Sequence, residues 1–224
     1  MLLPIRTNIW PKRTPYANYA LIFVNVLIFL ATYVQTTHGA DVRPWAAQFE
    51  LIPARPQVWQ FLTYAFLHGG FFHILGNMYF LYLFGNNVND KLGNLAYVCF
   101  YLGGAVFSGL GHALVNADSF IPTLGASGAV AAVTGAYLVL FPQTLITVLY
   151  WLIFIGTIEL PALYFILIKL IVIDNVMVRY AHVAYDAHLA GYAFGIVAIL
   201  GLLSVGLVDS SNFDLWAMIR RWNR

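Results

Sequence analysis

Apolar segments recur along almost the whole sequence, and this pattern restricts the chain to few kinds of fold. Of its 224 residues, 61% are hydrophobic and only 9% are charged. A soluble domain carries about 25% charged residues, so these few charges cannot cover a water-exposed surface. The sequence therefore predicts an all-α integral membrane protein embedded in a lipid bilayer, with about 20 apolar residues in each crossing helix.

Five segments have nearly this length, and a sixth is contained in a longer apolar stretch. The five are residues 17–33, 70–88, 95–115, 126–141 and 187–208. The stretch 144–173 is interrupted by Glu159 and Pro161, and it has room for two spans or for one span after a non-spanning excursion. The first segment lacks a convincing small-residue cleavage site, so we expect a span there and not a signal peptide.

Basic residues near the two ends of the chain decide between six and seven spans. They precede the first segment and follow the last one: Arg6, Lys12, Arg13, Arg220, Arg221 and Arg224. Positive residues favour the cytoplasmic side, and only an even number of spans puts both clusters there. We therefore expect six transmembrane helices, with 144–156 as the excursion. Residues 1–16 then form a short cytoplasmic segment, 17–208 the six-helix domain and 209–224 a basic cytoplasmic tail.

Composition also argues against several classes of function. The net charge is +2 and no basic run has interleaved aromatic residues, so we expect no nucleic-acid partner. Cys99 is the single cysteine, which excludes an intrachain disulfide and a multi-cysteine metal site. We expect no metal and no cofactor, and the oligomeric state is unknown from the sequence. Few intramembrane acids and no internal repeats argue against a transporter or channel.

In a six-span topology the second, fourth and sixth spans run in the same direction. Their outer ends carry polar side chains: His73, Asn77, Ser127 and His188. Ser127 lies between Gly125 and Gly128, which permit close backbone approach, at a helix start whose free N–H groups suit a developing negative charge. Ser127 is therefore the candidate nucleophile. Gly128 is alternatively part of a small-residue ridge for helix packing, and both interpretations are compatible.

His188 is the candidate general base, because an imidazole takes a serine proton and returns it to a leaving amine. Gly191 and Gly195 form a G-x-x-x-G pair, which permits the close helix approach that brings His188 to Ser127. Asp186 is two positions away and points to a different helix face, so we do not expect it to orient His188. The alternative is a histidine that simply faces water at a helix end.

His73 and Asn77 are four residues apart and share a helical face. Both donate hydrogen bonds, so they are candidates to stabilise an oxyanion; alternatively, they hold neighbouring helices together. His112, near the end of the third segment, is an alternative candidate base, but no spacing argument supports it and we interpret it as structural. Lys169 lies midway along the fifth span, where a cation either has a function or snorkels to the interface, and the sequence identifies no partner for it.

Together these residues resemble the rhomboid family of intramembrane serine proteases, over nearly the whole chain. The motifs are residues 73–77 (HILGN), 125–128 (GASG) and 187–195 (AHLAGYAFG). The resemblance implies a six-helix bundle with a water-filled cavity, a Ser127–His188 dyad, and an oxyanion stabilised by His73, Asn77 and the Ser127 N–H. The chain departs from the family at Ala131, where some members stack an aromatic ring on the catalytic histidine. It also departs at residues 89–93, where an acid–arginine pair is common.

The expected function is therefore an intramembrane serine endopeptidase that cleaves transmembrane helices of membrane proteins near their outer ends. The expected location is a bacterial inner membrane, with both termini in the cytoplasm. The alternative is a proteolytically silent rhomboid-like protein that binds transmembrane clients. Silent relatives typically lose the serine or the histidine, and this chain keeps Ser127 and His188.

Overall fold

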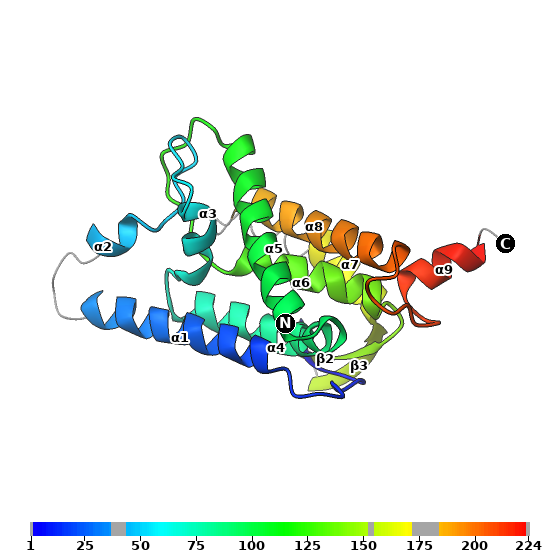
Figure 1. Ribbon diagram of the computed structural model, residues 1–224. Helices are drawn as coiled ribbons and strands as arrows, with labels where there is room; N and C mark the ends of the chain where they lie inside the picture. Colours follow the sequence, from blue (N-terminus) through cyan, green and yellow to red (C-terminus); the bar gives the residue numbers. More distant parts are fainter. Residues whose placement is uncertain (1, 37–43, 152–154, 172–183, 223–224) are drawn as a thin grey trace.

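The computed structural model describes residues 2–36, 44–151, 155–171 and 184–222, and it is mostly helical (Figure 1). The five longest helices are α1 (Tyr16–Thr36), α4 (Phe71–Leu92), α5 (Asn94–Val115), α6 (Ser127–Leu140) and α8 (Tyr185–Ser204). They coincide with the five expected apolar segments to within about one helical turn. The shorter helices are α2 (Pro44–Ala47), α3 (Gln60–Thr63), the 3₁₀ turn η1 (Tyr64–Phe66), α7 (Ala162–Ile168) and α9 (Leu215–Trp222).

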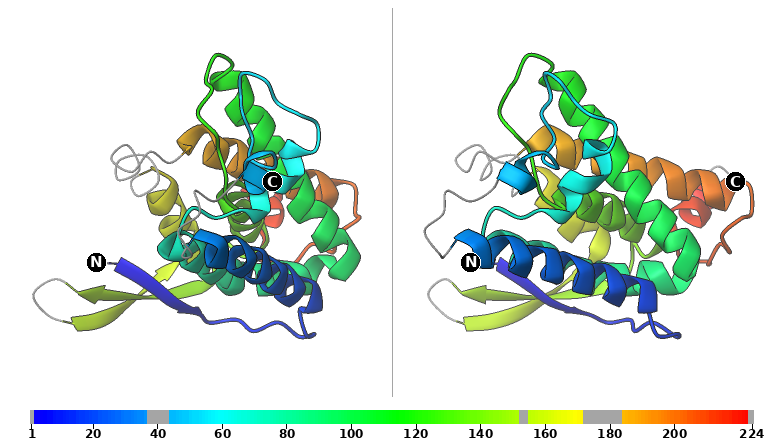
Figure 2. Two further views of the ribbon diagram at one scale, coloured as in Figure 1. Left: turned by 90° about the vertical axis from the view of Figure 1, so that its left-hand side faces the viewer. Right: turned by 60° about the vertical axis from the view of Figure 1, so that its left-hand side comes forward.

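Helix α6 forms the centre of the bundle. Every residue from Gly128 to Leu140 is buried, and α4, α5, α7 and α8 pack around it (Figures 1 and 2). A helix that is apolar on all faces is stable only when it is enclosed on all sides. Its many alanines and glycines present little side-chain bulk, so its neighbours can approach closely.

Helices α4 and α6 run in the same direction. The first turn of α4 places His73 beside Gly125, directly before α6. Further along both helices, the rings of Phe84 and Tyr137 lie 4.8 Å apart between centroids. Because the contacts advance together along both chains, the N-terminal ends of α4 and α6 meet at one end of the bundle.

A three-stranded antiparallel sheet corrects the all-α expectation. Strands β1 (Leu2–Thr7), β2 (Leu145–Trp151) and β3 (Ile155–Pro161) pair in the order β1-β2-β3, with Leu3 opposite Leu149. The expected excursion is thus mainly a hairpin, and its β-branched and aromatic residues are those that favour strands. Pro161 ends β3 because it has no N–H to donate to a further strand.

The number of spans stays a prediction. Among the described helices, α5 and α8 are long and apolar enough to cross a membrane; residues 16–32, 127–140 and 162–171 form shorter apolar helices. Helix α6, with 14 residues, is about 21 Å long, whereas the hydrocarbon core is about 30 Å thick. Most of the loop expected at 174–186 lies outside the described residues.

Both terminal elements lie at the end of the bundle where α6 ends. Strand β1 pairs with β2, which follows α6 after a short turn. On α9, the Met218 sulfur accepts a hydrogen bond from Gln143 Nε2 at 3.4 Å. Figure 1 shows the sheet and α9 at the same end, on the right of the view. The N-terminal ends of α4, α6 and α8 are at the opposite end.

Candidate active site

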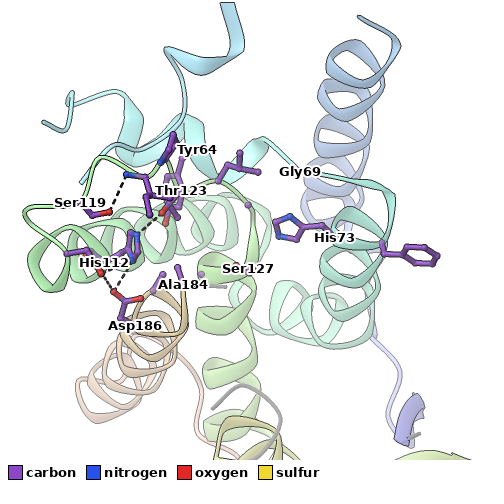
Figure 3. A pocket seen from close by; sticks show the side chains of 17 residues that line it. Tyr64, Gly69, His73, His112, Ser119, Thr123, Ser127, Ala184 and Asp186 are labelled. Carbon is purple, nitrogen blue, oxygen red and sulfur yellow. Dashed lines mark hydrogen bonds and ion pairs between the residues drawn. The ribbon is translucent and has the colours of Figure 1, made fainter. Parts of the chain in front are cut away.

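A cavity of about 780 Å³ lies where α6 and α8 begin. Its lining includes Ser127, His73, His112, Asp186 and Tyr64. Figure 3 shows Ser127 at the start of α6, with His73 on one side and the His112–Asp186 pair on the other. The cavity therefore brings two of the predicted site residues, Ser127 and His73, to one space.

Gly125 lets the His73 ring approach the start of α6. A Cβ atom at this position would lie 2.8 Å from His73 Nε2 and 3.8 Å from Ser127 Oγ. The backbone here has φ +129°, a region in which glycine is favoured over residues with a side chain. Both the space and the backbone conformation thus require glycine, and the imidazole and the hydroxyl lie near the same point.

Helices α6 and α8 meet backbone to backbone along a seam of small residues. A Cβ on Gly191 would lie 2.2 Å from the Gly128 carbonyl oxygen, and a Cβ on Gly195 would lie 2.0 Å from that of Ala132. Neither distance leaves room for a methyl group. The two contacts advance together along both chains, so α8 runs parallel to α6.

This seam places His188 at the level of Ser127. His188 precedes Gly191 by less than one turn of α8, and Ser127 directly precedes Gly128. His188 is 9% exposed and lies beneath the cavity, not in its lining. Ala131, one turn after Ser127, is buried and carries only a methyl group.

Asn77 also lies beneath the cavity, one turn after His73 on α4. It is 8% exposed, and its amide nitrogen Nδ2 is buried with no hydrogen-bond partner among the described residues. A buried donor without a partner costs free energy. Such a donor is suited to a negatively charged oxygen that forms only in the transition state of a reaction.

A hydrogen-bond network forms one wall of the cavity. His112 Nδ1 lies 2.9 Å from Asp186 Oδ2, and His112 Nε2 lies 2.6 Å from Thr123 Oγ1. Asn116 Nδ2 donates to the same carboxylate oxygen and to the His112 carbonyl. Asp186 therefore pairs with His112; that it does not orient His188 stays a prediction. The sequence offered no spacing argument for His112, so the network was missed.

His73 lines the opposite wall of the cavity, and His68, which is outside the lining, packs against it. The His68 ring stands edge-on to the His73 ring, with 5.2 Å between centroids. His68 is 3% exposed, and burial, together with the smaller effect of His73, lowers the pKa of His68 to about 3. This side chain is therefore neutral across the physiological pH range. His68 precedes His73 by five residues, which is not a zinc-motif spacing, so sequence reasoning did not assign it to the site.

Lys169 has partners that the sequence did not identify. Its Nζ donates to the Tyr192 hydroxyl at 3.0 Å and lies 5.0 Å from the centre of the Phe80 ring. The cation thus joins the end of α7 to α8 and α4. Among the described residues, no group of three or more His, Cys, Asp or Glu side chains gathers as metal ligands.

Comparison with known proteins gives a consistent family match. Residues 55–205 match the family model described as Rhomboid domain. The chain is 27% identical over 181 residues to the presenilin-associated rhomboid-like protein, mitochondrial, of Rattus norvegicus, covering 79% of this chain and 46% of that protein. It is 30% identical over 128 residues to rhomboid-like protein 11, chloroplastic, of Arabidopsis thaliana, covering 56% and 42%.

Bacterial relatives match over shorter regions. The chain is 34% identical over 79 residues to rhomboid protease GlpG of Yersinia pestis. The aligned region covers 35% of this chain and 27% of that protein. It is 31% identical over 100 residues to the putative rhomboid protease YdcA of Bacillus subtilis, covering 44% and 50%. In each comparison the match spans half or less of the relative's length.

Proposed function

Because the chain belongs to the rhomboid family of integral membrane proteins, we propose that it is an intramembrane serine endopeptidase. One observation carries the proposal. Ser127 and His73 share a cavity at the N-terminal ends of parallel helices, and the α6–α8 seam holds His188 at the same level. This arrangement supports nucleophilic catalysis, because a nucleophile, a base and hydrogen-bond donors converge where α6 begins.

The proposed dyad uses Ser127 as the nucleophile and His188 as the general base. His188 accepts the Ser127 hydroxyl proton while Oγ attacks the substrate carbonyl carbon, and the carbonyl π electrons move to its oxygen. When the intermediate collapses, His188 gives the proton to the leaving amine and the C–N bond breaks. A water molecule then attacks the acyl-enzyme with His188 as base, which releases the new carboxyl end and restores Ser127.

Three donors would stabilise the oxyanion. They are the His73 imidazole, the Asn77 amide and the Ser127 backbone N–H. The free N–H groups at the start of α6 also favour negative charge at this point. Removing one such donor from a hydrolase typically costs about 10²–10³ in kcat.

The proposed substrates are transmembrane helices of membrane proteins. A peptide bond inside a regular helix is shielded, so cleavage requires a segment that unwinds near its outer end. Small residues at the cut, with helix-breaking residues nearby, meet that requirement.

We further propose six membrane crossings, both termini in the cytoplasm and a bacterial inner-membrane location. The arrangement of β1 and α9 supports this, because both lie at the end of the bundle where α6 ends. The basic residues of the two termini then face the same side. A cysteine-accessibility scan tests the topology, and a C-terminus labelled from outside would overturn it.

The test of the activity compares the wild type with Ser127→Ala and His188→Ala in liposomes. A fluorophosphonate probe should label the wild type and not Ser127→Ala. Both variants should lose cleavage of a model transmembrane substrate. Full activity in either variant, with the protein correctly folded, would refute the dyad.

A second candidate is a silent protein that binds transmembrane clients, because two of the relatives carry rhomboid-like names without the word protease. Client capture that survives Ser127→Ala, combined with no cleavage and no probe labelling of the wild type, would favour it. The retention of both Ser127 and His188 favours the endopeptidase.

A further inference from the structure

The hydrogen-bond network at the cavity wall joins the two chain segments that carry Ser127 and His188. We propose that Asp186, His112 and Thr123 are positioning residues that fix the spacing between the nucleophile and the base. This inference rests on the proposed endopeptidase function. None of the three is proposed to touch the reacting atoms. Each acts through the backbone of the segment that carries Ser127 or His188.

The link begins on α8. Asp186 lies in the first turn of α8, two residues before His188. Its Oδ2 atom accepts hydrogen bonds from His112 Nδ1 and Asn116 Nδ2, both at the C-terminal end of α5. The carboxylate is therefore engaged by α5. What it fixes is the position of the α8 N-terminus, and with it the backbone of His188.

The link ends on the segment that leads to the nucleophile. Thr123 lies four residues before Ser127, and its hydroxyl lies 2.6 Å from His112 Nε2. Its backbone is held as well, because Thr123 N–H donates to the Leu51 carbonyl at 2.8 Å and Leu51 N–H donates back at 3.0 Å. The position of Thr123 is thus defined on two sides, which limits the movement of the chain up to Gly125.

His112 can hold both ends of the link in either protonation state. With Nδ1 protonated, it donates to Asp186 whether the ring is neutral or charged. Nε2 accepts the Thr123 hydroxyl proton in the neutral ring, and donates to the hydroxyl oxygen in the charged ring. The ring is 8% exposed, so little water competes for these bonds. The two ring nitrogens of His112 therefore connect α8 to the segment that leads to Ser127.

The experiment measures kcat, KM, the thermal midpoint and the rate of fluorophosphonate labelling in the full chain. Asp186→Ala should lower kcat and labelling by about tenfold or more with KM unchanged, because small displacements of catalytic groups are costly. Asp186→Asn should recover most of the rate, since its amide oxygen still accepts both hydrogen bonds. Asp118→Ala removes an exposed acid of the same outer loop and should match the wild type.

A double variant separates positioning from general destabilisation. Thr123→Val keeps the side-chain shape and removes only the hydroxyl, so it tests the other end of the link even if Asp186→Ala fails to fold. Because both substitutions break one link, Thr123→Val with Asp186→Ala should be no slower than the slower single variant. Multiplied losses in the double variant, or wild-type kcat in both single variants, would overturn the inference.

The outcomes also separate this inference from the proposed function. A wild type that neither cleaves nor takes the probe overturns the endopeptidase and the positioning role together. An active wild type with an equally active Asp186→Ala overturns the positioning role alone. A loss in Asp186→Ala that Asp186→Asn does not recover, with lowered thermal midpoints in both, also overturns it, because that pattern describes a purely structural acid.

Discussion

The two walls of the cavity are held in different ways. On one wall, His112 uses both ring nitrogens in hydrogen bonds to Asp186 and Thr123. On the other, His68 and His73 face each other edge-on, and His68 is stabilised by burial in its neutral form. Histidine thus has two roles here: His112 connects two segments by hydrogen bonds on one wall, and His68 is a buried packing group at the other.

This difference determines how each wall responds to a proton. The network offers His112 a carboxylate partner, so protonation keeps both hydrogen bonds. The opposite wall offers His68 another histidine as its neighbour, so the cost of burying a charge there exceeds what the backbone hydrogen bond to Phe66 returns. The predictions below test this contrast, in order of decreasing expected effect on stability.

The largest effect should come from Gly195→Ala, because it disrupts the close contact between α6 and α8 that holds both walls of the cavity together. The new Cβ would lie 2.0 Å from the Ala132 carbonyl oxygen, and backbone atoms on both helices leave no room for adjustment. We expect a loss of about 3 kcal/mol or more in unfolding free energy, measured by thermal unfolding in detergent. Gly201→Ala on the same helix, with nothing within 4 Å, is the matched control, and equal melting of the two variants would contradict the prediction.

The second largest effect should be a loss of unfolding free energy in acid, caused by His68 and not by His112. Below about pH 6.5 the unfolded chain binds a proton at His68, whereas the folded protein does not until its pKa of about 3. Stability is therefore complete above that range and falls as the pH decreases through it, by about 2 kcal/mol from pH 7 to 5.

Two substitutions assign this acid sensitivity to one wall. His68→Gln should remove most of the loss between pH 7 and 5 in a denaturant titration, while His112→Gln should keep it. If His112→Gln removed the loss and His68→Gln did not, the contrast between the walls would be reversed.

Gly125→Ala should act where the histidine wall meets the start of α6. At φ +129° a methyl group is strained and would lie 2.8 Å from the His73 ring, which costs about 1–2 kcal/mol. The activity should fall further than the stability, because the His73 ring must move away from Ser127. Gly70→Ala, with extended backbone and nothing within 4 Å, should leave probe labelling at the wild-type rate; a similar decrease in both would count against a local effect.

The smallest effect is expected at Lys169, which lies outside both walls. Lys169→Met loses the hydrogen bond to Tyr192 but also removes the cost of keeping a cation partly out of water. The net change in unfolding free energy should stay within about 1 kcal/mol, with the labelling rate unchanged. A large decrease in labelling would mean that α7 contributes to the walls.

The sequence was most informative where the length of a run of apolar residues determines the secondary structure. The five longest helices follow from runs of apolar residues, and the rhomboid motifs identify the family. The strands were missed because residues 145–151 are as apolar as a membrane helix, and hydropathy alone does not separate a hairpin from a span. The catalytic roles of Ser127, His188, His73 and Asn77 stay predictions for the experiments above.

The network could not be inferred from the sequence for a different reason. His112, Thr123 and Asp186 come from α5, the following loop and α8, and only the packing of these elements brings them together. Local periodicity reports neighbours three or four residues apart, so it does not connect residues on three different elements. The polar character of Asp186 was visible, but its partner was not.

The pairing of β1 with β2 sets an order of events during synthesis. Residues 2–7 are synthesised before their partners, residues 145–151, which follow only after α1, α4, α5 and α6 have been made. Until then the backbone groups of β1 that later bond to β2 must bond to water. The sheet therefore closes only after the central helix α6 has been made, and it joins an earlier segment of the nascent chain to a later one.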